Sequence, residues 1–276
     1  MKLGIDAGND QVKICGDYGL INFISAIGES RLINLQQIHG QDDMYFEYQG
    51  ESGFAGTLAL YESEFVGSIM GSTKAHKDTL LRVLIGIHRY STLYNLNESI
   101  FDIVVGQPII MHNHIEKEKI KGMLKGQHTL TVNGITKTFI INRVECAAEC
   151  ATAYWSNPKE GLVRIIDIGG GTVNYSTVLN GRFIDKDSDT LTFGVNTTKT
   201  NNLQALARGI STQLLKKWDQ NDKTFLIGGI AEQMVSHLKN YFPNARVLYP
   251  IFNRQQISPI FANAISFYIL AVNIYE

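Results

Sequence analysis

A short segment, VRIIDIGGGTVNYST at residues 163–177, combines the residue types that can bind a phosphate chain. An apolar run ends on an acidic residue, and three glycines, a threonine and a second β-type run follow: Asp167, Gly169, Gly170, Gly171 and Thr172. Glycines leave backbone N–H groups open to an anion, because no Cβ blocks its approach. An acidic residue there would repel a bare phosphate, so Asp167 suggests Mg²⁺ with its waters between them. Three glycines alone are equally typical of a flexible hairpin turn.

A second segment of the same design opens the chain, LGIDAGNDQVKI at residues 3–14. Again an apolar run ends on an aspartate, a glycine and a small polar residue follow, and a β-type run resumes: Asp6, Gly8 and Asn9. Lys13 lies four residues beyond Asn9 and could reach back to a phosphate as a point charge. About 160 residues separate the two segments. Their repetition predicts a duplicated domain that binds one nucleotide between its halves.

A third segment, FLIGGIA at residues 225–231, places a strand, a glycine pair and the start of a helix in succession. Together the three segments resemble the nucleotide-binding motifs of the actin, Hsp70 and sugar-kinase superfamily. The first two match its phosphate loops, and the third matches its adenosine motif through Gly228, Gly229 and Ala231. The resemblance implies an α/β fold of two ribonuclease-H-type halves with a nucleotide cleft between them. It also implies ATP, or GTP, with Mg²⁺ that Asp6 and Asp167 contact through water.

The superfamily resemblance further implies a Gln or Glu that orients the attacking water, at the start of the helix before the second phosphate hairpin. Positioning is most of what phosphoryl transfer asks of a protein. In the segment ECAAECATAY two residues fit, Glu145 and Glu149. We favour Glu145, because it begins the predicted helix and small residues follow it, and Glu149 one turn later is the alternative. Asp167 completes the predicted catalytic pair.

The spacing of apolar residues predicts the elements that position these segments. We expect strands at 2–7, 11–16 and 20–27, a buried helix at 74–94, a strand at 100–106, and helices at 112–124 and 145–156. A second series follows the 163–177 hairpin: a helix at 197–218, a strand at 224–227, a helix at 230–240 and a C-terminal helix at 257–274. The first half then spans 1–143, with a small insertion around 28–73, and the second spans 144–276. We expect the C-terminal helix to pack back on the first half.

The distance between Asp167 and Gly228 is only 61 residues, which leaves no room for an inserted subdomain in the second half. Most of the superfamily carries one there, called IIB, and it forms one wall of the base pocket. The sequence therefore resembles the AlfA type of bacterial plasmid-segregation actins, which lack IIB. The base would then be held by a neighbouring protomer or in a looser site.

This resemblance implies a filament-forming ATPase that segregates plasmid DNA through a separate DNA-binding adaptor protein. Two other functions fit the same fold: a small-molecule kinase, and a nucleotide-dependent binding protein that does not polymerise. A net charge of −1 gives no basic surface for nucleic acid, so we expect no direct contact with DNA. No apolar run reaches the ~20 residues of a membrane span. Three cysteines, an odd number, favour reduced thiols and a cytoplasmic location.

Overall fold

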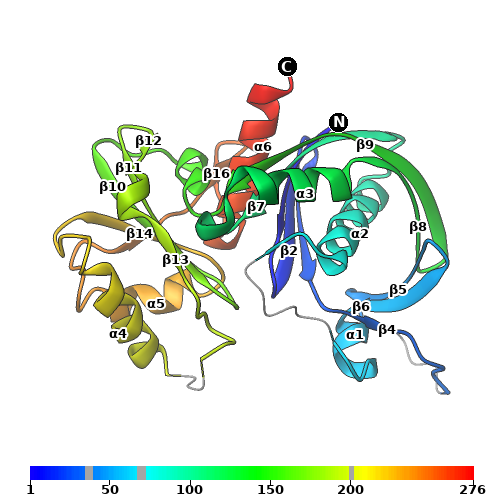
Figure 1. The fold of residues 1–276 in the computed structure, drawn as a ribbon, viewed down its shortest axis with the longest axis horizontal. Helices are drawn as coiled ribbons and strands as arrows, with labels where there is room; N and C mark the ends of the chain where they lie inside the picture. Colours follow the sequence, from blue (N-terminus) through cyan, green and yellow to red (C-terminus); the bar gives the residue numbers. More distant parts are fainter. Residues whose placement is uncertain (35–39, 67–72, 199–201) are drawn as a thin grey trace.

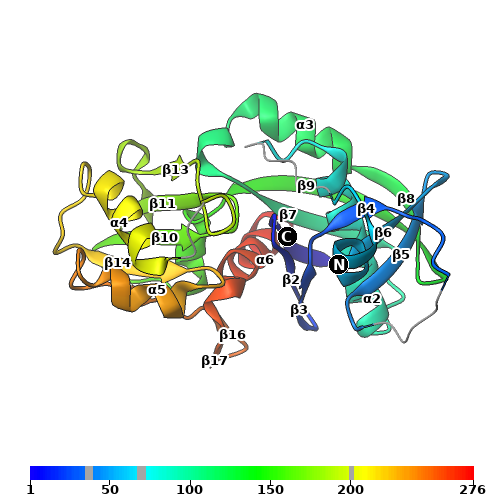
Figure 2. The same ribbon diagram turned by 90° about the horizontal axis from the view of Figure 1, so that it is seen from below.

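The computed structural model describes residues 1–34, 40–66, 73–198 and 202–276, and all statements below concern these residues. The chain forms two lobes, each built on one mixed β-sheet, with the last helix at their junction (Figure 1, Figure 2). Parts of two predicted segments, the insertion at 28–73 and the helix at 197–218, fall on residues 35–39, 67–72 and 199–201 and lie outside the described residues.

The sheet of the first lobe contains nine strands in the order β3-β2-β1-β7-β9-β8-β5-β6-β4. Five neighbouring strands form one side of this sheet, with β3 at its edge: β3 (Gly19–Ile24), β2 (Gln11–Gly16), β1 (Lys2–Ala7), β7 (Ile100–Gln107) and β9 (Ile135–Ala148). β1 pairs antiparallel with β2 and parallel with β7, and β7 pairs parallel with β9. The first predicted hairpin is thus confirmed as β1 and β2, with Asp6 near the end of β1.

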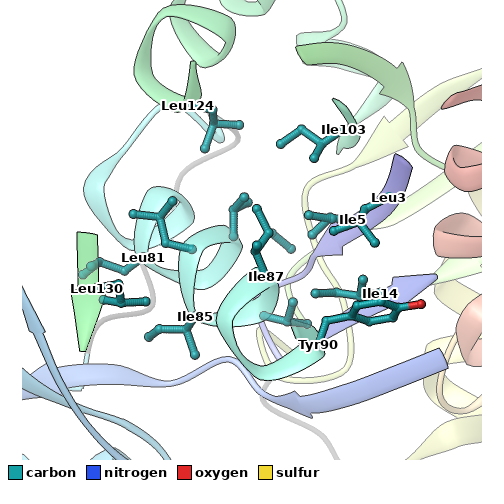
Figure 3. Close-up of a cluster of buried hydrophobic side chains, with 14 of the residues drawn as sticks. Leu3, Ile5, Ile14, Leu81, Ile85, Ile87, Tyr90, Ile103, Leu124 and Leu130 are labelled. Carbon is teal, nitrogen blue, oxygen red and sulfur yellow. The ribbon is translucent and has the colours of Figure 1, made fainter. Parts of the chain in front are cut away.

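Helix α2 (Lys77–Leu93) covers one face of this sheet. Its apolar side chains, including Leu81, Ile85 and Ile87, form one cluster with residues of β1, β2 and β7 (Figure 3). All residues from 81 to 88 are buried, so the helix is enclosed on nearly all sides and not along one stripe only. Helix α3 (His114–Leu124) adds Ile120 and Leu124 to the same core.

The predicted insertion does not form a separate unit but extends the same sheet. Its strands are β4 (Ile27–Glu29), β5 (Asp43–Tyr48) and β6 (Glu51–Gly56), followed by α1 (Thr57–Glu62). β5 pairs with β8 (Gly126–Val132), which forms a hairpin with the long strand β9. Asn133 and Gly134 make the two-residue turn of that hairpin, and both have positive φ.

The sheet of the second lobe is smaller, and its central strands are paired as in the first lobe. Its strands are β10 (Leu162–Ile168), β11 (Val173–Leu179), β12 (Arg182–Phe183), β13 (Asp189–Leu191), β14 (Lys223–Ile227) and β15 (Arg246–Val247). β10 pairs antiparallel with β11 and parallel with β14, which repeats the arrangement of β1, β2 and β7. The two helices of the lobe, α4 (Leu203–Leu214) and α5 (Ala231–Leu238), contribute to a core that includes Trp218 and Phe242. Between β13 and β14 the described residues contain one helix, α4, and no inserted subdomain.

The chain then returns to the first lobe. A small hairpin of β16 (Ile251–Phe252) and β17 (Gln255–Gln256) leads into α6 (Ala262–Ile274). α6 lies so close to β1 that a Cβ on Gly4 would overlap Ala264 O and Tyr268 N. Phe267 of α6 also packs with Val104 of β7. None of the described helices is long and apolar enough to cross a membrane.

One predicted element is wrong, and two are shorter than expected. The segment 145–156 is not a helix, because β9 continues to Ala148 and only a 3₁₀ turn, η2 (Thr152–Ser156), follows. Parallel pairing of β9 with β7 satisfies this backbone, and it outweighs the helix propensity of the alanines. The described helix α4 begins only at Leu203, where the Asn202 side chain accepts a hydrogen bond from Ala205 N. At the C-terminus α6 begins at Ala262, after a 3₁₀ turn, η4 (Pro259–Phe261).

Candidate functional site

The largest feature between the lobes is a cleft into which the two glycine turns project. It encloses about 1000 Å³ of space, part of it open to solvent, and its walls come from both lobes. The turns face each other closely: a Cβ on Gly171 would lie 2.9 Å from Asn9 Nδ2, and one on Gly170 would lie 3.4 Å from Asp10 Cβ. Because Gly170 and Gly171 have no side chains, the backbone of the second turn can come this close to the first turn and to a shared ligand.

Two aspartates lie at the ends of equivalent strands on this cleft. Asp6 is on β1 and Asp167 on β10, and each is less than one-tenth exposed. Burial, followed by the negative charge of Asp6, raises the pKa of Asp167 to about 7 from its ordinary value of 3.8. Lys13 Nζ lies 3.3 Å from Asp6 Oδ2. Burial acts to lower the pKa of Lys13, but Asp6, Asp167 and Glu149 together raise it.

These two carboxylates fit a hydrated divalent cation better than a metal enclosed by protein ligands. Burial, and after it repulsion from Asp6, raises the pKa of Asp167 although Lys13 lies nearby, so this pair of carboxylates can accept a cation. Among the described residues no three His, Cys, Asp or Glu side chains gather into a metal-binding group. Mg²⁺ suits such a site, because it keeps several waters and is held by one or two carboxylates together with substrate phosphates.

Glu149 lines the cleft, whereas Glu145 does not. Glu145 is on β9, and its Oε2 lies 3.0 Å from Lys121 Nζ on α3. Glu149 follows the end of the strand, is 7% exposed, and accepts a hydrogen bond of 3.2 Å from Asn174 Nδ2. The geometry therefore favours the alternative residue, because the predicted helix that was to present Glu145 is absent.

Lys74 is a second cationic residue in the cleft, and sequence reasoning missed it. Its Nζ lies 3.2 Å from Glu149 Oε1 and donates a hydrogen bond of 2.8 Å to Ala7 O. It is 7% exposed, and its pairing with Glu149 accounts for this burial of a charged side chain. No motif surrounds Lys74 in the sequence, and only the fold brings the segment before α2 to the end of β1.

The glycine turn of the second lobe is covered by the segment 193–197. Val195 N and Asn196 N donate hydrogen bonds to Gly169 O and Gly170 O, at 3.1 and 2.8 Å. Val195 and Asn196 also line the cleft, so this segment forms a wall beside the turn. The lining also includes apolar residues, among them Ile230 and Ile260.

Most residues predicted from the sequence meet in this one cleft. Its lining includes eleven of them: Asp6, Gly8, Asn9, Lys13, Asp167, Gly169, Gly170, Gly171, Thr172, Gly228 and Gly229. Ala231 is fully buried in the core under α5 and does not line the cleft. Several lining residues lie outside the sequence motifs: Lys74, Val195, Asn196, Ile260 and Asn263. The earlier motifs mark turns and strand ends, while these residues reach the cleft only through tertiary packing.

Two lobes that repeat one strand arrangement around a shared cleft, with glycine turns and aspartates facing each other, define an actin-like fold. The family described as "Actin like proteins N terminal domain" matches residues 4–151, more than half of the chain. The chain therefore belongs to the actin-like proteins. No curated protein matches the chain significantly.

Solved structures resemble the chain over nearly its whole length. An AlfA filament bound to AMPPNP aligns with a TM-score of 0.75 at 20% identity, covering 98% of this chain and 95% of that one. A filament of AlfA from B. subtilis plasmid pLS32 gives a TM-score of 0.77 at 18% identity, with 97% and 98% covered. Ta0583, an archaeal actin homolog, gives 0.75 at 17% identity, with 99% of each chain covered. At these identities the likeness establishes the actin-like fold.

Proposed function

We propose that this protein is an actin-like ATPase that polymerises with bound nucleotide and so segregates plasmid DNA. The observation that carries the proposal is the meeting of both glycine turns, both buried aspartates and two lysines in one cleft of an actin-like fold. The similar fold of two AlfA filaments, one of them bound to AMPPNP, supports both nucleotide binding and self-association. The proposed partners are further copies of the chain and a separate DNA-binding adaptor, with ATP or GTP as the nucleotide.

The residues of the cleft have distinct proposed roles. The N–H groups of the turns at Gly8–Asn9 and Gly170–Thr172 would bind the phosphate oxygens, and Lys13 and Lys74 would neutralise their charge. Asp6 and Asp167 would hold Mg²⁺ through its waters. Bound Mg²⁺ would supply charge stabilisation at the phosphates.

Glu149 is the residue that we propose orients the attacking water. Its carboxylate lies in the cleft, and Lys74 and Asn174 hold its two oxygens from different sides. A carboxylate fixed in this way can position a water molecule beside the terminal phosphate, which is the main catalytic demand of the reaction. Glu145 would instead stabilise the contact between β9 and α3 through Lys121.

The base would lie against the apolar part of the cleft, near Gly228, Gly229 and Ile260. Gly228 has a φ of +98°, and a Cβ there would lie 2.7 Å from Ile168 O, so a side chain would collide with the end of β10. The segment 193–197 would stand in part for the wall that subdomain IIB gives in larger relatives. We place the protein in the cytoplasm, in keeping with three buried cysteines that form no disulfide.

Sedimentation of the purified full chain with and without ATP and Mg²⁺ tests the proposal. We expect the chain to pellet with nucleotide and remain in solution without it, and electron micrographs of the pellet should show filaments. Soluble protein that phosphorylates a small molecule would identify a kinase instead. Soluble protein with a stable nucleotide complex would identify a binding protein, and either result would overturn the proposal.

A further inference from the structure

Asn263, on the first turn of α6, is a buried polar side chain in the wall of the cleft. It is 6% exposed, and its neighbours on the helix, Ala262 and Ala264, are fully buried apolar residues. A buried amide is costly unless hydrogen bonds satisfy it, so its presence in an apolar helix requires partners.

Both ends of the Asn263 amide are engaged. Nδ2 donates a hydrogen bond of 2.8 Å to Asp167 Oδ2, and Oδ1 accepts one of 3.0 Å from Cys150 N. The reversed amide would place its oxygen against a carboxylate and its NH₂ against an N–H donor, so the two partners fix its orientation. One side chain therefore binds the proposed metal-site carboxylate and the backbone directly after Glu149.

The backbone at Cys150 needs support of this kind. Its φ is +66°, in the left-handed region that a residue with a side chain rarely occupies. Such a conformation costs roughly 1–3 kcal/mol and persists only where its surroundings hold it. The bond from Cys150 N to Asn263, together with the bond from Glu149 N to Gln107 O, holds the turn that directs Glu149 into the cleft.

The helix that carries Asn263 is fixed to the first lobe. α6 lies in direct backbone contact with β1 at Gly4, two residues before Asp6 on the same strand. Asp167 belongs to β10 of the second lobe. The Asn263 amide thus links the lobe of Asp6 to the carboxylate of Asp167, across the junction where α6 lies in Figure 1 and Figure 2.

We propose that Asn263 is a positioning residue for nucleotide hydrolysis, which holds Asp167 and the Glu149 turn in one geometry relative to Asp6. This inference rests on the proposed function. Asn263 makes no chemical step itself, but it sets the orientation of two carboxylates that do. Its loss should therefore reduce turnover more than it reduces nucleotide binding, since the glycine turns and lysines remain.

The test compares Asn263→Leu, which keeps the size but removes both hydrogen bonds, with the wild-type full chain. We expect kcat for ATP hydrolysis to fall roughly 10- to 100-fold, as for residues that support metal ligands. The KM for ATP should change by less than threefold, and the Mg²⁺ concentration for half-maximal rate should rise. The control is Asn157→Leu, because Asn157 also bonds through its amide, to Tyr249 O, but does not line the cleft.

A second variant separates the two hydrogen bonds of Asn263. Asn263→Asp keeps an acceptor for Cys150 N but replaces the donor to Asp167 with a carboxyl group, so kcat should still fall although the bond to Cys150 N remains. If Asn263→Leu does not fold, Asn263→Asp still tests the inference. Wild-type kcat in both variants would overturn the inference and leave the proposed function standing. If the wild-type chain itself neither bound nor hydrolysed nucleotide, the proposed function would fail.

Discussion

At the scale of single residues, the main feature of the cleft is a group of charged side chains that lie close together and are largely shielded from water. Asp6 and Asp167 face the same cavity, with Lys13 beside one of them, and Glu149 is held by Lys74. Carboxylates in this arrangement are costly in the folded protein until cations and phosphates join them. The site is thus complementary to a metal-bound phosphate chain, and its own stability should depend on pH.

The pH dependence follows from Asp167, whose pKa is raised to about 7. Between about pH 4 and 7 the folded chain keeps a proton that the unfolded chain releases, so the free energy of unfolding falls as pH rises through this range. Without Mg²⁺ and nucleotide, Asp167→Asn should be more stable than wild type at pH 8, by on the order of 2 kcal/mol. The difference should shrink toward pH 4.

Urea unfolding of both chains at pH 5 and pH 8 measures this difference. Asp185→Asn, at an exposed carboxylate, controls for the loss of one negative charge. Equal stability of wild type and Asp167→Asn at pH 8 would contradict the burial and repulsion that we assign to Asp167.

The two glutamates give a second prediction at the residue scale. Glu149→Gln should lower the single-turnover rate of ATP hydrolysis roughly 100-fold or more, because it removes the carboxylate beside the attacking water. Glu145→Gln is the matched control, and it should hydrolyse ATP at close to the wild-type rate, since it disturbs only the contact with Lys121. If instead Glu145→Gln lost activity and Glu149→Gln kept it, Glu145 would be the residue that orients the water. The cleft would then have to change its shape during the reaction.

At the scale of elements, the junction of α6 and β1 is the contact on which the site depends. Gly4 allows this contact, because a Cβ there would overlap the helix backbone. Gly4→Ala should therefore lower the free energy of unfolding by roughly 1–3 kcal/mol, the usual cost of overpacking. Gly122→Ala is the matched control: Gly122 lies inside α3 with no atom within 4 Å of the added methyl, so the change should stabilise by about 0.5–1 kcal/mol.

Denaturant unfolding of Gly4→Ala, Gly122→Ala and wild type measures the expected decrease and the expected increase in the free energy of unfolding in one experiment. If Gly4→Ala were as stable as wild type, α6 could not lie against β1 as described.

Local signals in the sequence were enough to predict the elements that carry the glycine turns. The hairpins β1–β2 and β10–β11 follow from apolar runs, glycines and strand-type residues that are close in sequence. The end of β9 could not be predicted in this way, because its alanines favour a helix and the pairing with β7 that overrides them is non-local. For the same reason the favoured glutamate was Glu145, although the cleft receives Glu149.

Lys74 and Asn263 show the same limit for the site. Each lies far in sequence from both glycine turns, and neither stands in a recognisable motif. Lys74 reaches the cleft because its segment runs past the end of β1, and Asn263 does so because α6 returns to the first lobe. Such positions follow from packing between distant elements, which residue spacing does not encode.

At the scale of the whole molecule, two similar lobes share one proposed ligand site. The second lobe lacks an inserted subdomain among its described residues, as the 61-residue spacing between Asp167 and Gly228 indicates. Closure of the lobes would then depend on contacts near the phosphates: the facing turns, the lysines and the Asn263 amide. Binding of nucleotide at this point would give a physical reason for the proposed polymerisation to depend on nucleotide.

Calorimetric titration of the full chain with AMPPNP and Mg²⁺ tests this central claim most directly. The account predicts one nucleotide bound per chain. It also predicts that Gly171→Val stays folded but loses binding by roughly tenfold or more, because its side chain would fill the gap between the turns beside Asn9. Absence of binding to wild type, or undiminished binding to Gly171→Val, would contradict it.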